Sequence, residues 1–261
     1  MDAAMVLLVD VHAHLDLFKD DLDGVIARAK AAGVKVIIAN GVDSQTNRVV
    51  LDLAKKYDIV KPALGIYPPD ALQQEVDVGD YPIQLKPYDV DEELAFIEKS
   101  EPVALGEVGL DYKTGKDIAG QKELFQKFID LSKKLDIPLI VHSRKAEQVV
   151  IDMLDASGAK KVVLHCFSGK KSLIKRAAGK GWSFSIPTNV VRSEHFQNMI
   201  NMVHISQLLT ETDAPLLSPF PGQRNEPAFV LESLKKIAEL KGLTVEDAAN
   251  AVFQNYQNLF L

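Results

Sequence analysis

The sequence predicts an α/β protein of the (β/α)8 barrel class, forming a single domain over residues 1–261. Short apolar segments rich in Val, Ile and Leu alternate with amphipathic segments along the chain, as buried parallel strands alternate with the helices that cover them. About eight such units fit into 261 residues, and this number and length are typical of a closed barrel.

An open, doubly wound sheet is the main alternative, because its local pattern of strands and helices is the same. The chain has no G-x-G-x-x-G motif and no P-loop, which weakens a nucleotide-binding version of that fold. No break in composition marks a second domain.

Eight segments are expected to be strands, and eight others are expected to be helices. The strands are MVLLVDVH (5–12), VKVIIANG (34–41), VKPALGIY (60–67), PVALGEVG (102–109), IPLIVHS (137–143), KVVLHCF (161–167), WSFSIPT (182–188) and SQLLTETD (206–213). The helices are 20–32, 44–57, 92–100, 117–135, 146–157, 193–202, 226–240 and 244–258. The expected N-caps are Asp20, Ser44 and Thr244, and the expected helix stops are Gly33, Gly158 and Gly242.

Composition limits the class of protein. No apolar run approaches the ~18 residues of a membrane span, and the lone Cys166 excludes an internal disulfide. These features favour a cytoplasmic protein, with a monomer as the default. The net charge of −6 argues against a protein that coats duplex DNA. It is compatible with an enzyme that takes one phosphodiester into a local site, where bound cations add positive charge.

The first candidate site residues are His12 and His14, at the end of the first expected strand. Residues i and i+2 of a strand point to the same face, so the two imidazoles should lie side by side. Taken alone, this pair fits either a metal site or two structural hydrogen-bonding groups.

Other candidate ligands stand where four further apolar runs stop. They are Glu107, His142, His165 and Asp213. A barrel gathers the carboxyl ends of its strands at one mouth, where residues of several strands build the active site. Burying carboxylates among apolar strands is costly unless a cation or a donor neutralises them. The sequence therefore predicts one metal centre made of all six residues.

Six nitrogen and oxygen ligands are too many for one open zinc site and suit two divalent metals. Glu107 is the expected bridge. Barrel closure makes the first and last strands neighbours, so His12, His14 and Asp213 should complete one metal. His142 and His165, from adjacent strands, should complete the other. Zn²⁺, Mn²⁺ and Mg²⁺ all remain open as the native metal.

Strand alternation also predicts which residues next to these ligands face the mouth of the barrel and which face away from it. Cys166 should point away from His165 as a packing residue, and Ser143 should face away from the mouth. Arg144 should share the face of its ligand neighbour two residues before. Asp10 and Glu211 should lie one layer deeper and support the ligands from behind.

The motifs DVHAHLD, GEVGLDY, HSR, HCFSG, ETDAP and GQRNEP resemble, in this order, those of the TatD-type metal-dependent DNases in the amidohydrolase superfamily. The resemblance implies a barrel with a binuclear divalent site, the same six ligands, and nuclease activity on single-stranded DNA or its 3′ ends. It also implies that Arg224 and Asn225 shape the rim of the site.

The chain departs from this family at two places. Tyr67, in GIYPPD, stands where the family often has a His-Pro pair, and SIPTNVVRS after the seventh expected strand looks unlike the common form. A tyrosine can donate a hydrogen bond or stack on a base but does not become cationic near neutral pH. The polar segment from Tyr67 to Asp91 is either an insertion or a flap over the site.

The predicted reaction is hydrolysis of phosphodiester bonds in DNA. Bound cations lower the pKa of water, Asp213 takes the proton, Glu107 holds both metals, and Arg144 grips phosphoryl oxygens. Tyr67, Arg224 and Asn225 are the other expected substrate contacts. The same ligands could instead serve a hydrolase of a small ester, lactone or phosphotriester, or an aminoacyl-tRNA deacylase. A non-catalytic metal-binding protein is the alternative from a different class.

Overall fold

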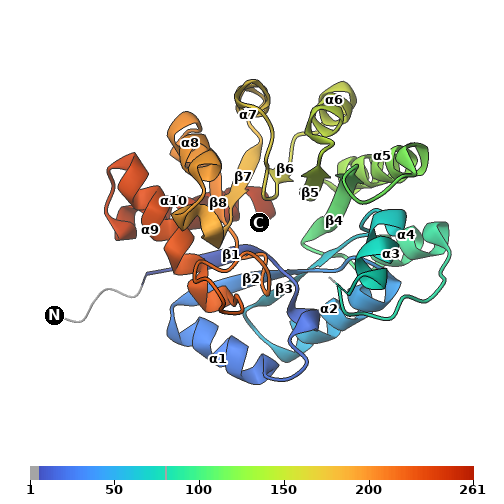
Figure 1. Ribbon diagram of the computed structural model, residues 1–261, viewed down its shortest axis with the longest axis horizontal. Helices are drawn as coiled ribbons and strands as arrows, with labels where there is room; N and C mark the ends of the chain where they lie inside the picture. Colours follow the sequence, from blue (N-terminus) through green and yellow to red (C-terminus); the bar gives the residue numbers. More distant parts are fainter. Residues whose placement is uncertain (1–5, 80) are drawn as a thin grey trace.

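Eight parallel strands form one sheet in the order β1 to β8, with the helices outside it (Figure 1). The computed structural model of the protein describes residues 6–79 and 81–261. Ala13 and Ala214 form a parallel bridge between the ends of β1 and β8. On either side of it, Asp213 N donates to His12 O and His14 N donates to Ala214 O, both at 2.8 Å. The sheet thus closes into the predicted (β/α)8 barrel, and the open-sheet alternative is wrong.

Every expected strand is present, although most are shorter than their apolar runs. The strands are β1 Leu8–Ala13, β2 Val34–Asn40, β3 Val60–Leu64, β4 Ala104–Asp111, β5 Leu139–Arg144, β6 Val162–Leu164, β7 Ser183–Ile186 and β8 Leu208–Thr210. Met5, where the first strand was expected to begin, lies outside the described residues. Nearly all strand residues are buried, because side chains of one face fill the barrel and those of the other pack under the helices.

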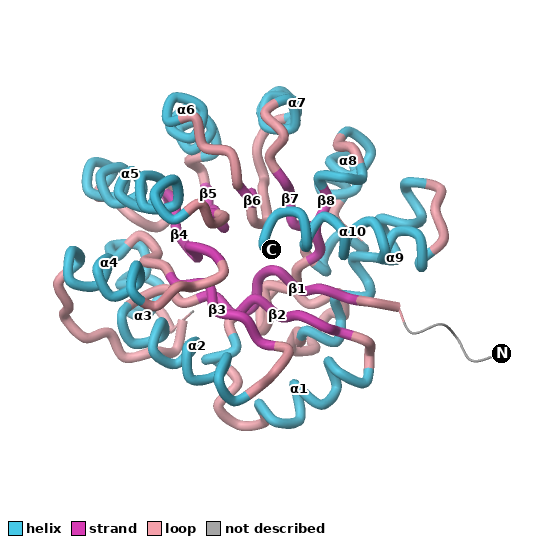
Figure 2. Tube along the Cα trace, turned by 180° about the vertical axis from the view of Figure 1, so that it is seen from behind, coloured by secondary structure: helices cyan, strands magenta, loops and turns pink. Residues whose placement is uncertain are grey.

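In both views the helices lie around the outside of this ring, except that the C-terminal end of α10 lies over its centre (Figures 1 and 2). They are α1 Leu22–Ala31, α2 Ser44–Lys56, α3 Pro69–Asp77, α4 Val90–Lys99, α5 Ile118–Leu135, α6 Glu147–Ser157, α7 Lys171–Gly179, α8 Glu194–Met202, α9 Val230–Lys241 and α10 Val245–Phe260. Short 3-10 turns at Leu15–Leu17, Thr188–Val191, Ile205–Gln207 and Pro227–Phe229 lie between them. The sequence prediction missed α3 and α7. None of the helices in the described part of the chain is long and apolar enough to cross a membrane.

Two of the expected N-caps were wrong by one residue. Asp43 caps α2, because its carboxylate accepts from Thr46 N while Thr46 Oγ1 accepts from Asp43 N, a reciprocal capping box. Asp21 precedes α1 in place of Asp20. Thr244 caps α10 as expected, accepting from Asp247 N at 3.0 Å.

The described residues between β3 and α4 include a helix that sequence analysis did not predict. This part of the chain contains α3 and packs through a small apolar cluster that is separate from the barrel core; the members of this cluster are Leu17, Val42, Tyr67, Ala71, Leu72 and Tyr81. We call residues 67–79 together with Tyr81 the α3 segment. Because it follows β3, it lies at the carboxyl-end mouth of the barrel, where it forms one wall of the site described below.

Candidate metal centre

All six predicted ligands come together at the mouth of the barrel. His12, Glu107 and His142 lie within β1, β4 and β5, whereas His14, His165 and Asp213 lie just beyond the ends of β1, β6 and β8. All are buried or nearly so. Residues from five strand ends thus meet, as barrel closure requires.

Glu107 lies between the two predicted halves of the centre. Its Oε2 is 3.5 Å from His12 Nε2 and 3.4 Å from His14 Nε2. Its Oε1 is 2.9 Å from His142 Nδ1 and 3.9 Å from His165 Nε2. Each carboxylate oxygen therefore faces one pair of histidines, which is the arrangement expected of a bridging ligand.

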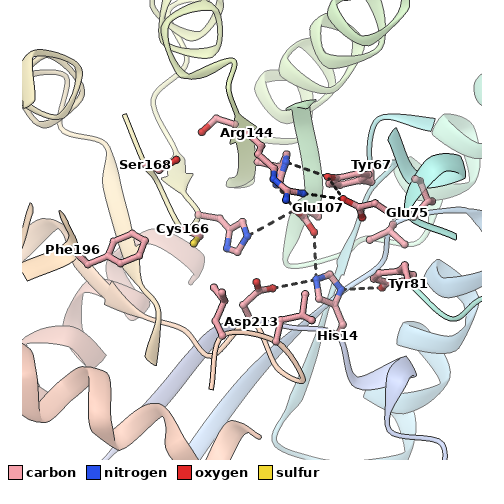
Figure 3. Close-up of a pocket in the computed structure, with 17 residues that line it drawn as sticks. His14, Tyr67, Glu75, Tyr81, Glu107, Arg144, Cys166, Ser168, Phe196 and Asp213 are labelled. Carbon is pink, nitrogen blue, oxygen red and sulfur yellow. Dashed lines mark hydrogen bonds and ion pairs between the residues drawn. The ribbon is translucent and has the colours of Figure 1, made fainter. Parts of the chain in front are cut away.

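Asp213 completes the first half. Its Oδ1 is 3.5 Å from His12 Nε2 and 3.4 Å from His14 Nε2. The two Nε2 atoms are themselves only 3.2 Å apart. Nitrogen lone pairs this close repel each other unless a proton or a cation lies between them. Figure 3 shows His14 pointing toward both Glu107 and Asp213.

Three of the four histidines use their outward nitrogen for a hydrogen bond. His165 Nδ1 is 2.8 Å from Glu211 Oε2, His142 Nε2 is 3.2 Å from Asp111 Oδ2, and His14 Nδ1 is 3.2 Å from the Tyr81 hydroxyl. His12 Nδ1 has no partner among the described residues. Metal-binding histidines commonly have such outward partners, which fix the tautomer and the ring orientation.

The donor set fits divalent metal ions. Two groups of side chains place one ligand atom each within 4.8 Å of one another: His12 with His14 and Asp213, and His12 with Glu107 and His165. The first is the predicted half-site. The second contains His12 where His142 was expected, although His142 Nδ1 also faces Glu107. Imidazole and carboxylate donors in these numbers suit Zn²⁺ or Mn²⁺.

The electrostatics of the centre favour bound positive charge. Burial alone raises the pKa of Glu107, but hydrogen bonds from His12, His14 and His142 outweigh it and hold that pKa well below its usual value. Burial lowers the pKa of His142, yet Asp111 and Glu107 more than compensate and raise it to about 9. The carboxylates therefore stay ionised and favour positive charge on the histidines or on bound cations next to them.

The centre forms the floor of a cavity of about 340 Å³. Leu72, Phe196 and Leu216 contribute apolar walls, and Arg144 and Ser168 contribute polar groups. Figure 3 shows Phe196 on the side opposite Tyr67. A cavity with apolar walls and a few convergent polar groups is typical of a ligand-binding or active site.

Strand alternation sorted only some neighbours of the ligands correctly. Glu211 lies behind His165, and Asp10 accepts from His12 N and Thr212 N, so both support the site from a deeper layer. Cys166, however, lines the cavity, because the chain has left β6 and has φ +42° there. Ser143 also lines the cavity, next to Arg144 at the end of β5.

Arg224 and Asn225 hold loops next to the site, and the expectation that they shape its rim stays a prediction. Neither lines the cavity. The Asn225 amide is fully buried and donates to Thr212 O and Leu216 O at 2.8 and 2.6 Å, which holds the loop that carries Asp213. Arg224 donates to Leu17 O at 2.6 Å. Both residues therefore fix loops.

Three residues of the site were missed by sequence analysis. Asp111 stands four residues after Glu107 in β4, so strand alternation could have placed it on the same face. Glu75 lies 3.2 Å from the guanidinium of Arg144, and Tyr81 contacts His14. These two belong to the α3 segment, whose polar composition gives no pattern that indicates their direction.

Fold and site together define a barrel hydrolase that depends on metal ions. Residues 9–261 match the family model described as TatD related DNase, and the chain belongs to this family. The chain is 36% identical to a protein named deoxyribonuclease TATDN3 from Homo sapiens, over all of this chain and 97% of the relative. It is 34% identical to the uncharacterized metal-dependent hydrolase YabD of Bacillus subtilis, over 97% of this chain and 99% of that one.

A solved structure supports the same assignment. The TatD homologue YjjV of Escherichia coli K12 superposes with a TM-score of 0.83 at 29% identity, covering 97% of each chain. A phosphotriesterase homology protein of Escherichia coli has a TM-score of 0.66 at 14% identity, a likeness that extends to the fold alone. The family resemblance predicted from the motifs is confirmed, and the protein is a metal-dependent hydrolase.

Proposed function

We propose that this protein is a deoxyribonuclease that hydrolyses phosphodiester bonds at two divalent cations, acting on single-stranded DNA or 3′ ends. The position of Glu107 carries the proposal. Its two oxygens face different pairs of histidines, Oε2 toward His12 and His14, and Oε1 toward His142 and His165. The name of the human relative supports DNA as the substrate.

The centre would hold one cation through His12, His14 and Asp213 and the other through His142 and His165, with Glu107 shared. When bound, two divalent cations supply positive charge opposite the phosphoryl oxygens and lower the pKa of water.

Asp213 has the position of a general base. Its Oδ1 faces His12 and His14, which leaves Oδ2 to accept a proton from the attacking water. Its carboxylate stays ionised near neutral pH, because the surrounding histidines outweigh burial and lower its pKa. The loop that carries it is held by Asn225, so the carboxylate has a fixed direction.

Arg144 and Tyr67 form the substrate side of the cavity. The Arg144 guanidinium is 42% exposed and pairs with Glu75, so it can turn to a phosphoryl oxygen and donate two hydrogen bonds. The Tyr67 ring lines the cavity, which suits a contact with a sugar or a base. Its hydroxyl is already used by Asp111 at 2.8 Å.

The test is cleavage of DNA oligonucleotides labelled at the 3′ or 5′ end, single- and double-stranded, with Mg²⁺, Mn²⁺, Zn²⁺ or a chelator. Shortening from the 3′ end of single strands, abolished by chelator, is the expected result. Cleavage that resists the chelator would contradict the proposal. A parallel panel of esters, lactones, phosphotriesters and aminoacyl-tRNA tests the other hydrolase reactions, since turnover of one of these without DNA cleavage would replace the nuclease.

A further inference from the structure

Two ligand histidines have a tyrosine at their outward nitrogen. The Tyr81 hydroxyl is 3.2 Å from His14 Nδ1, and the Tyr67 hydroxyl is 3.2 Å from His142 Nε2. Both tyrosines are only 5% exposed. Figure 3 shows Tyr81 beside His14 and Tyr67 above Glu107, both on the side of the α3 segment. The α3 segment, which lies outside the barrel, therefore contacts a histidine in each half of the centre.

We propose that Tyr81 and Tyr67 are positioning residues for the metal ions. They hold His14 and His142 in the tautomer and ring orientation that turn a nitrogen lone pair toward the cations. This inference rests on the metal centre of the proposed function and adds to it a part of the chain that the six ligands do not include.

The tautomer of His14 follows from its surroundings. Its Nε2 faces Glu107 and Asp213 at 3.4 Å, so Nε2 must be unprotonated to bind a cation. A neutral imidazole then carries its hydrogen on Nδ1. That N–H donates to the oxygen of Tyr81, and Nδ1 has no other hydrogen-bond partner among the described residues. At its outward nitrogen, His14 is thus held by one phenol, that of Tyr81.

His142 is held by two groups. Its Nδ1 faces Glu107 Oε1 at 2.9 Å and must be unprotonated to bind a cation there, so the hydrogen of the neutral, cation-bound ring lies on Nε2. That N–H points to Asp111 Oδ2 and to the Tyr67 oxygen, each at 3.2 Å. The Tyr67 hydroxyl donates in turn to Asp111 Oδ2 at 2.8 Å. Without Tyr67, the carboxylate of Asp111 would still hold this ring.

The positions of both phenols are fixed by packing that does not depend on the ligands. Tyr67 and Tyr81 belong to the apolar cluster of the α3 segment, which is separate from the barrel core. A phenylalanine at either position would keep this packing and lose only the hydroxyl. The substitution therefore separates positioning of the histidine from support of the fold.

The experiment is a titration of metal-free protein with Zn²⁺ and, separately, Mn²⁺, in competition with a chromophoric chelator. Tyr81→Phe should weaken cation binding by about 10–100-fold. Tyr67→Phe should weaken it less, because Asp111 remains. Tyr88→Phe is the matched control: it belongs to the same connection between β3 and α4, and its hydroxyl makes no hydrogen bond to the described residues. Its cation affinity should equal that of wild type.

A second measurement reports the tautomer directly. In nitrogen-15 spectra of the zinc-loaded protein, the Nδ1–H of His14 should exchange slowly with water in wild type and faster in Tyr81→Phe. Unchanged exchange together with wild-type zinc affinity would overturn the inference. If Tyr81→Phe does not fold by circular dichroism, Tyr67→Phe decides by the same titration, and wild-type affinity in that variant would overturn it.

Glu107→Ala distinguishes failure of the proposed metal centre from failure of the role proposed for the tyrosines. If wild type binds no more cation than Glu107→Ala, the proposed metal centre is wrong and this inference falls with it. If wild type binds cations, Glu107→Ala does not, and Tyr81→Phe binds like wild type, only the role of the tyrosines is wrong.

Discussion

The two halves of the metal centre differ in what supports their histidines. On the β5–β6 side, His142 and His165 each have a carboxylate at the outward nitrogen, Asp111 and Glu211. On the β1 side, His14 has the neutral phenol of Tyr81, and His12 Nδ1 has no partner among the described residues.

This difference indicates that the two halves of the candidate centre are not equivalent. A carboxylate behind an imidazole raises its basicity and fixes its direction more strongly than a phenol does. The β1 side has instead Asp213 as a direct ligand candidate, 3.4 Å from His14. We therefore expect the β5–β6 side to derive its affinity for metal from supporting residues, and the β1 side from a charged ligand that also takes part in the reaction.

The largest effect should come from removing what the two halves share. Glu107→Ala takes a ligand from both, so DNA cleavage should fall by more than about 10⁴-fold and bound metal should fall in elemental analysis. The control is Glu123→Ala, whose side chain is 76% exposed. Loss of metal from one half only would show that Glu107 does not bridge.

The second largest effect should come from a change on the β1 side alone, at Asp213. Asp213→Asn keeps the size of the side chain but removes the base, so kcat should fall by about 10²–10⁴-fold. Thermal unfolding should change little. The control is Asp52→Asn at an exposed ion pair with Lys55. Near wild-type kcat in Asp213→Asn would contradict the assignment of the base.

Stepwise chelation tests whether the two halves of the centre bind metal with different affinities. With increasing chelator, the Mn²⁺ on the β1 side should leave first, seen by paramagnetic resonance as a change from a coupled pair to a single ion. Glu211→Gln should reduce this difference, with about 10–100-fold weaker binding of the retained ion. Simultaneous loss of both ions in wild type would show that the supporting residues do not set the order.

The smallest effect should be at the rim of the β5–β6 side. Arg144→Ala should raise KM for DNA roughly tenfold and change kcat little, because a half-exposed guanidinium contributes through a charged hydrogen bond that water partly replaces. Arg176→Ala, which breaks ion pairs between α6 and α7, is the control. An equal loss in kcat would place Arg144 at the reacting phosphoryl group.

The barrel and the meeting of the six candidate ligands at its mouth could be predicted because both follow from regular periodicity. Alternation placed His12 beside His14, and the ends of apolar runs placed His165 and Asp213 close to where they lie. Rules of this kind fail where the backbone leaves the strand. Cys166 has φ +42° and turns toward the cavity, which alternation cannot predict.

The α3 segment was beyond sequence reasoning for a different reason. Tyr81 contacts His14 although they are 67 positions apart along the chain, and nothing in the polar stretch around Tyr81 indicates which way its side chain points. The same holds for Asn225, which looks like a rim residue in GQRNEP but is buried by its bonds to the loop of Asp213. Contacts of irregular segments depend on tertiary packing, not on local pattern.

Closure of the barrel at Ala13 and Ala214 also has a consequence for biosynthesis. The chain emerges from the ribosome N-terminal end first, so His12 and His14 are made some 200 residues before Asp213, the residue that lies opposite them. Contacts so distant in sequence form late in folding. A growing chain therefore carries an incomplete set of candidate ligands until Asp213 has been made and the barrel has closed.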